Sequence, residues 1–157
     1  MEKIDPKKAQ EVWQRVLQSR QEHPSEEQLQ QWLSEIMARE RGYRSINAGR
    51  QTPLLRKMAA EEQQYRRQLA ALYFLLYGKK AEVLSGASPD KRSLASALRE
   101  AYTSEQSAMR QWRDAAQHYP MHRELFEKFV QGDRRHMELL RRIMAANLQN
   151  WDLQRRF

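Results

Sequence analysis

Asp133 and His136 lie three residues apart in the stretch DRRHMELL, inside a row of apolar residues with helical spacing. Residues three apart share a face of a helix, so an acid and a histidine interrupt a face that would otherwise be wholly apolar. A carboxylate and an imidazole in this arrangement can ligate a metal ion or form a buried hydrogen-bonded pair. These two residues alone leave both alternatives open.

Polar residues also interrupt the apolar faces of the other predicted helices. They are Glu40 in 26–46, Glu62 and Tyr65 in 53–77, and Glu105 in 90–117. Counting from the turns that join the helices, at roughly 1.5 Å of rise per residue, places Glu62, Glu105 and Asp133 at one depth. We therefore expect these three carboxylates and His136 to converge in the middle of a helical bundle.

Buried carboxylates without a partner are costly, because each loses the hydration that stabilises its charge. Their charge can be neutralised by a metal cation, by protons held at a raised pKa, or by arginines that reach inward. A divalent ion is the most compact solution, since Glu, Asp and His are ligands that iron, manganese and zinc accept. The alternative is a vestigial, metal-free network hydrogen-bonded by Tyr65, Tyr102 or a neighbouring arginine.

The elements that must position these residues are helices. Apolar residues recur with a helical period through 26–46, 53–77, 90–117 and 121–147, and no segment alternates as a strand would. The irregular stretch after Gly78 is much longer than the other connections and predicts a crossover. The fold class is therefore predicted to be all-α, an antiparallel four-helix bundle connected as hairpin, crossover and hairpin.

We divide the chain into an N-terminal helix and linker (1–24), the bundle (25–150) and a C-terminal tail (151–157). The short extra helix starts at Asp5-Pro6, a cap followed by proline at the first helical position. One of its faces carries the apolar residues Ala9, Val12, Trp13, Val16 and Leu17. A helix this short must dock, either across its own bundle or on a second copy, and we expect a homodimer.

The sequence also bears on how the tryptophans and the C-terminal tail pack. The spacing of Trp13, Trp32 and Trp112 predicts core packing. The tail either packs through Trp151 and Phe157 or frays.

Composition excludes several kinds of site. There is no cysteine, so disulfides, thiolate zinc sites, iron–sulfur clusters and cysteine nucleophiles are ruled out. We find neither a signal peptide nor an apolar run of membrane-spanning length, and we expect a cytoplasmic protein without a membrane partner. The net charge of +8 permits nucleic acid as a partner, but the basic residues are spread along every helix, which favours a solvated surface.

Three stretches resemble helices of the ferritin-like superfamily, and within it the rubrerythrin-like bundles. The stretch LLRKMAAEEQQYRRQLAALYFLLYGKK resembles their second bundle helix, LREAYTSEQSAMRQW the third and ELFEKFVQGDRRHMELL the fourth. That family places a glutamate on each of two helices and Glu-x-x-His on each of the other two, around a di-iron centre. The resemblance covers roughly residues 26 to 146. It implies metal-ligand positions at Glu62, Glu105, Asp133 and His136.

Two departures reduce the implied site. Tyr65 stands where the family has a histidine, and Ile36 stands where the first helix has a glutamate. We therefore expect a degenerate site that binds at most one iron or manganese ion, weakly, with Tyr65 or Glu40 as extra contributors. For Tyr65 we favour a core tyrosine that donates to Glu62, and for Glu40 a salt bridge to an arginine.

The sequence is compatible with three functions. The first is a ferritin-like metal-binding protein, which if active would be a metal-dependent oxidoreductase of the rubrerythrin-like type. The second is a metal-free structural or interaction bundle. The third is a basic, nucleic-acid-binding relative of the mini-ferritins. No residue supplies electrons for peroxide reduction, because the cysteine-ligated module of full-length rubrerythrins is absent.

Overall fold

The computed structural model describes residues 5–83 and 92–155, without the side chains of 16–21 and 148–155. These residues form five α-helices and two short 3-10 turns, and none of them lies in a β-strand. The helices are α1 (Pro6–Gln21), α2 (Glu26–Ser45), α3 (Thr52–Tyr77), α4 (Leu94–His118) and α5 (Arg123–Arg155). The turns η1 (Gly49–Gln51) and η2 (Pro120–His122) precede α3 and α5. The all-helical prediction is confirmed.

Local sequence signals set several helix ends. The hydroxyl of Ser25 accepts from the N–H of Gln28 and caps α2, and Ser93 caps α4 in the same way. Gly78 ends α3 in the left-handed conformation at φ 70°, which glycine adopts without strain. Two predicted ends were wrong. Helix α4 starts at Leu94 rather than near residue 90, and α5 continues to Arg155, through most of the predicted tail.

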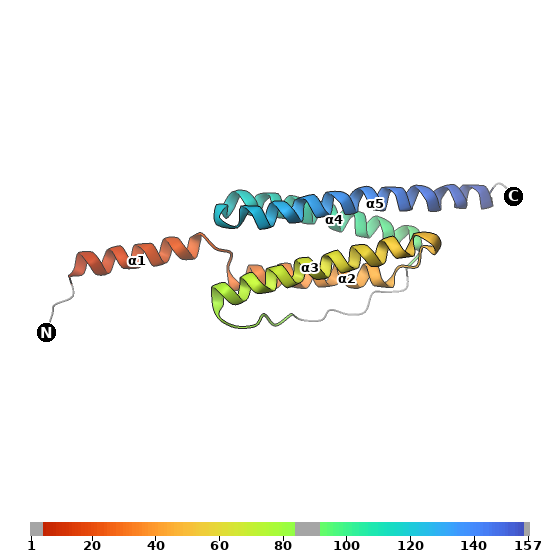
Figure 1. Ribbon diagram of the computed structural model, residues 1–157. Coiled ribbons are helices and arrows are strands. Elements are labelled where there is room, and N and C mark those ends of the chain that lie inside the picture. Colours follow the sequence, from red (N-terminus) through yellow and green to blue (C-terminus); the bar gives the residue numbers. More distant parts are fainter. Residues whose placement is uncertain (1–4, 84–91, 156–157) are drawn as a thin grey trace.

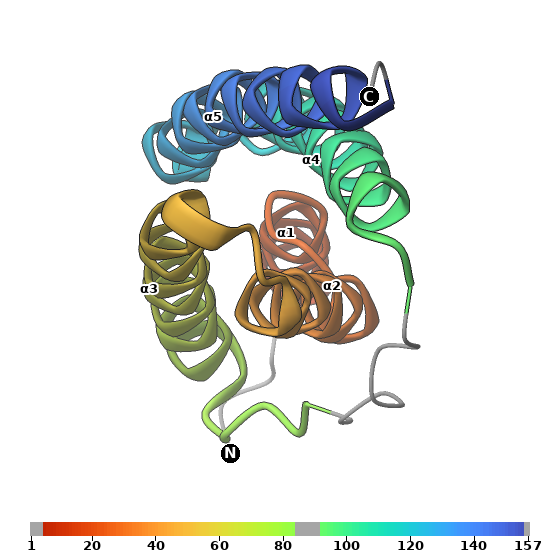
Figure 2. The same cartoon turned by 90° about the vertical axis from the view of Figure 1, so that its right-hand side faces the viewer.

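Helices α2 to α5 lie side by side, and we call them the bundle (Figure 1). Seen along its axis, the bundle is a pair of hairpins, with α4 and α5 above α2 and α3 (Figure 2). Helix α2 also contacts α4, and α3 contacts α5. Helix α3 ends at one end of the bundle and α4 begins at the other, so the chain between them must traverse its length (Figure 1).

The interior of the bundle contains two separate apolar clusters. One is rich in aromatic rings and includes Trp32, Tyr65, Leu69, Tyr73, Trp112, Phe126 and Phe129. The other is largely aliphatic and includes Tyr43, Leu55, Met58, Leu98, Leu140 and Ile143. On every bundle helix the buried polar residues fall between these two sets, so the fold holds a polar layer between two apolar ones.

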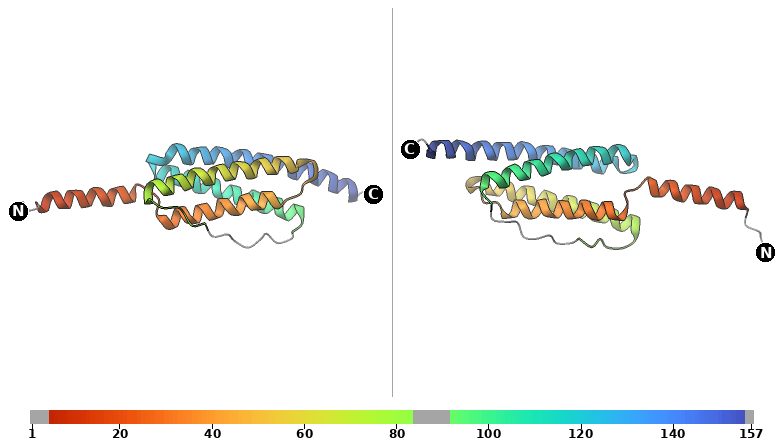
Figure 3. Two further views of the ribbon diagram at one scale, coloured as in Figure 1. Left: turned by 60° about the horizontal axis from the view of Figure 1, so that its bottom comes forward. Right: turned by 180° about the vertical axis from the view of Figure 1, so that it is seen from behind.

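Helix α1 extends away from one end of the bundle, and the last part of α5 extends from the other (Figure 3). The predicted core packing of Trp13 was wrong, because its side chain is 63% exposed and Val12 is exposed as well. Directly after α1 the chain contacts the bundle, where His23 Nδ1 lies 2.7 Å from His122 Nε2 and Tyr77 donates to the carbonyl of Pro24. Four other residues of the sequence predictions have side chains outside the described part of the structure. They are Val16, Leu17, Trp151 and Phe157.

Candidate metal centre

The four predicted ligand residues converge in the polar layer. Glu62 comes from α3, Glu105 from α4, and Asp133 and His136 from α5, and each has an exposed fraction of 0%. One ligand atom of each residue lies within 4.8 Å of the ligand atoms of the other three. The helical period and the depth counted from the turns were therefore sufficient to find this cluster.

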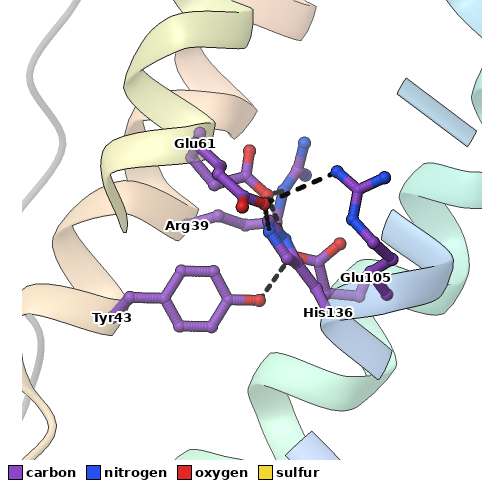
Figure 4. A network of polar contacts seen from close by, with 7 residues as sticks. Arg39, Tyr43, Glu61, Glu105 and His136 are labelled. Atoms are coloured by element: carbon purple, nitrogen blue, oxygen red, sulfur yellow. Dashed lines mark hydrogen bonds and ion pairs between the residues drawn. The ribbon is translucent and has the colours of Figure 1, made fainter. Parts of the chain in front are cut away.

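Helix α2 contributes two further side chains, Arg39 and Tyr43 (Figure 4). The guanidinium of Arg39 is buried, and its Nε lies 3.5 Å from Oε1 of Glu62. The hydroxyl of Tyr43 donates to Oε1 of Glu105. Neither residue was identified from the sequence as a member of this cluster. The spacing Trp32, Ile36, Arg39, Tyr43 is itself helical and would have shown that Arg39 lies on the buried face.

His136 is held from both sides of its ring. Its Nε2 lies 2.6 Å from Oε2 of Glu61, a residue of α3 that is about one-third exposed. Its Nδ1 lies 3.1 Å from Oε1 of Glu105 and 3.4 Å from Oε1 of Glu62. Glu61 was also missed by sequence reasoning. In a neutral imidazole the proton belongs on Nε2, facing Glu61, which leaves Nδ1 as the lone-pair atom facing the cluster.

The protonation pattern reflects burial and mutual repulsion. Burial, then the charges of Glu105 and Glu62, raises the pKa of Asp133 to about 10. Burial raises the pKa of Glu62 to about 7, against the opposing effect of Arg39. For Glu105, burial alone would raise the pKa, but the hydrogen bond to His136 and the charges of His136 and Arg39 together lower it to about 2. Without a metal, the cluster therefore keeps a proton on Asp133 at neutral pH.

The basic members of the cluster respond in the opposite sense. Burial by itself would lower the pKa of His136, but hydrogen bonds to Glu105, Glu61 and Glu62 raise it to about 12. Burial would likewise lower the pKa of Arg39, and the charges of the carboxylates around it raise that pKa instead. Both cations are thus stabilised by the acids they face.

The donor set fits a metal ion. Both carboxylate oxygens of Glu62, both of Asp133 and Oε2 of Glu105 are buried without a hydrogen-bond partner. Buried polar atoms in folded proteins are almost always satisfied, and a group of unsatisfied carboxylate oxygens in one place calls for an electropositive partner. Carboxylate oxygens with one imidazole nitrogen are a ligand set that iron, manganese and zinc accept.

Tyr65 does not play the part predicted for it. Both oxygens of Glu62 lack a hydrogen-bond partner, so the predicted bond from Tyr65 is absent. The Tyr65 ring instead packs against Phe129 at 4.9 Å between centroids, and its hydroxyl lies where a Cβ on Gly132 would be. The absence of a side chain at Gly132 leaves a slot in α5, and the hydroxyl of Tyr65 occupies it instead of bonding to Glu62.

Two other predicted participants lie outside the cluster. Glu40 forms salt bridges with Arg44 at 3.3 Å and Arg66 at 3.2 Å, which confirms the predicted ion pair. Tyr102 accepts hydrogen bonds from Arg141 at the surface and does not take part in the polar layer.

Within residues 5–83 and 92–155, no helix has the length and apolar character needed to cross a membrane. Comparison with known proteins found no matching family model, no matching curated protein and no matching solved structure.

Proposed function

We propose that this protein is a ferritin-like bundle whose central site binds a single divalent transition-metal ion, iron or manganese. The observation that carries the proposal is the group of buried carboxylate oxygens of Glu62, Glu105 and Asp133 that lack a hydrogen-bond partner. Burying a carboxylate charge that is not fully compensated costs roughly several kcal/mol. A divalent ion in contact with all three would remove that cost in the smallest volume.

The orientation of His136 supports the same proposal. Its Nε2 faces Glu61 at 2.6 Å, which is the arrangement of a metal-ligating histidine held by an outer carboxylate. Its Nδ1 then faces Glu105 and Glu62 as a lone-pair donor. Glu61 would thus fix the ring without being a ligand itself.

The arrangement of the helices also supports a ferritin-like bundle. Two helical hairpins joined by a chain that traverses the bundle are the connection expected for that superfamily. In the resemblance, Ile36 and Tyr65 replace two ligands of a di-iron centre, and here Ile36 is buried among apolar residues while Tyr65 packs on Phe129. The remaining ligands suffice for one ion. A bound iron or manganese ion would supply one-electron redox chemistry, but our proposal is binding, not turnover.

Metal content tests the proposal directly. Purified protein is loaded with iron(II) or manganese(II), passed through a desalting column and analysed for metal per chain. We expect one ion per chain in the wild type, none in Asp133→Ala and weaker binding in Glu62→Gln. Glu40→Gln is the matched control, because Glu40 pairs with Arg44 and Arg66 outside the cluster. Wild type without metal, or with two tightly held ions, would contradict the proposal.

A second function, a metal-free structural bundle, is favoured by one observation. Arg39 already brings a buried positive charge to Glu62, and a protonated His136 brings another. With a proton on Asp133, these charges can balance the cluster without any metal. The two functions differ in what Asp133→Asn does. The substitution weakens metal binding if metal is the native partner, and it leaves stability unchanged or raised if the network is metal-free.

A further inference from the structure

Arg39 is a buried cation placed beside buried acids. Its side chain has an exposed fraction of 7%, and its Nε lies 3.5 Å from Oε1 of Glu62. The charges of Glu62, Glu105 and Asp133 all act on its guanidinium. An arginine cannot release its proton in a protein, so Arg39 contributes one permanent positive charge to the polar layer.

This fixed charge limits the total charge of the metal ions that the polar layer can bind. With their oxygens on a metal ion, the three acids carry three negative charges, and His136 is neutral because Nδ1 is a ligand. Arg39 offsets one negative charge, and the remaining two match one divalent ion. Glu61 lies outside this count, since it is about one-third exposed and faces Arg135 at 3.8 Å. A trivalent ion or a second divalent ion would leave a net positive charge in a buried layer, which is costly.

We propose that Arg39 is a specificity-determining residue that makes the cluster select one divalent ion over a trivalent ion. This inference rests on the proposed metal-binding function and adds its charge selectivity. Arg39 takes the place of a second cation beside Glu62. For iron, the same selectivity favours the iron(II) state of the bound ion over iron(III).

A purely structural role for Arg39 would affect folding and the affinity for every ion alike. Charge selection affects the ratio of two affinities instead. The readout is therefore the manganese(II) to gallium(III) affinity ratio, since neither ion changes oxidation state during the titration. Both titrations use a chelator-buffered solution that keeps gallium soluble.

The variants are Arg39→Met, which keeps the apolar stem and removes the charge, and Arg39→Gln, which remains polar in case the first variant does not fold. Arg39→Lys keeps the charge. Arg66→Met is the matched control, because Arg66 pairs with Glu40 outside the cluster. We expect Arg39→Met and Arg39→Gln to shift the ratio towards gallium by about tenfold or more, as expected for one buried unit charge. Arg39→Lys and Arg66→Met should keep the wild-type ratio.

An unchanged ratio in both neutral variants, with manganese still bound by the wild type, overturns the role of Arg39 and leaves the proposed function intact. A wild type that binds neither ion overturns the proposed function and this inference together. A wild type that prefers gallium overturns the inference alone.

Discussion

Phe129 and Asp133 lie one turn apart on α5, and both are fully buried, but their surroundings differ in kind. The Phe129 ring packs at 4.9 Å from Tyr65 and 5.0 Å from Trp112, between centroids. The oxygens of Asp133 face Glu62 and Glu105 and accept no hydrogen bond. Burial stabilises an apolar ring, whereas it raises the free energy of an unpaired carboxylate. The comparison indicates that the aromatic cluster stabilises the fold, whereas the polar layer carries a free-energy cost that the proposed metal ion would remove.

The largest effect is expected on the apolar side of this comparison. Phe129→Ala should lower the free energy of unfolding by about 3 to 5 kcal/mol, because it removes a buried ring and leaves a cavity among tightly packed neighbours. Urea unfolding of the two proteins measures the difference. A loss below about 1 kcal/mol would mean that the aromatic cluster can collapse into the gap and does not support the bundle.

The polar layer should respond in the opposite direction. In metal-free protein, Asp133→Asn should raise the free energy of unfolding by about 1 to 3 kcal/mol, because the amide is neutral without the proton that burial and the charges of Glu105 and Glu62 force Asp133 to keep at neutral pH. Unfolding is measured in the presence of a chelator, with Asp114→Asn, an exposed aspartate on α4, as the control. Destabilisation by Asp133→Asn would show that Asp133 has a stabilising partner even without metal.

The proton held on Asp133 also predicts that stability depends on pH. The pKa of Asp133 is raised from 3.8 to about 10, so the folded protein holds a proton that the unfolded chain has already released. Its stabilising contribution is present below the unfolded pKa and is lost as pH rises towards the folded pKa. His136, raised from 6.5 to about 12, acts in the same direction. The melting temperature of metal-free protein should therefore fall between about pH 7 and about pH 10, and less steeply in Asp133→Asn.

The smallest effect on the bundle is expected from α1. Trp13 is 63% exposed and lies on a helix that extends away from the bundle, so Trp13→Ala should change the unfolding of the bundle by no more than about 0.5 kcal/mol. Trp112→Ala in the aromatic cluster is the matched comparison. The Trp13→Ala variant also bears on the predicted homodimer, because docking on a second copy was one of the two alternatives for α1. Sedimentation of wild type and Trp13→Ala tests this, and a dimer lost only in the variant would assign α1 to the interface.

The candidate ligands could be predicted because they obey two simple rules. Glu62, Glu105, Asp133 and His136 share the apolar phase of their helices, and their distances from the turns place them at one depth. Counting depth from the connections did not identify Arg39, because its backbone lies about one helical turn closer than Ile36 to the connection between α2 and α3. Side chains on a helix tilt towards its N-terminus, so a long arginine reaches back from residue 39 into the layer.

The contact of Glu61 with His136 and the direction of α1 could not be predicted from the sequence. Glu61 lies on a mostly polar face of α3 and contacts His136 only because of how α3 and α5 are rotated against each other. Periodicity within one helix carries no information about that rotation. Likewise, the apolar residues of α1 identify a face but not its partner. Trp13 has the spacing of a core residue although α1 extends away from the bundle.

The slot that Gly132 leaves in α5 makes the residue types at positions 65 and 132 depend on each other, although the two are far apart in the sequence. A glycine inside a helix normally costs about 1 kcal/mol relative to alanine. Here an added methyl group would collide with the hydroxyl of Tyr65. At Gly42 in α2 no atom lies within 4 Å of the added carbon, so alanine is tolerated there. In homologues of this chain, residues 65 and 132 should therefore covary, with alanine at 132 accompanying a smaller side chain at 65, and each change alone should be selected against.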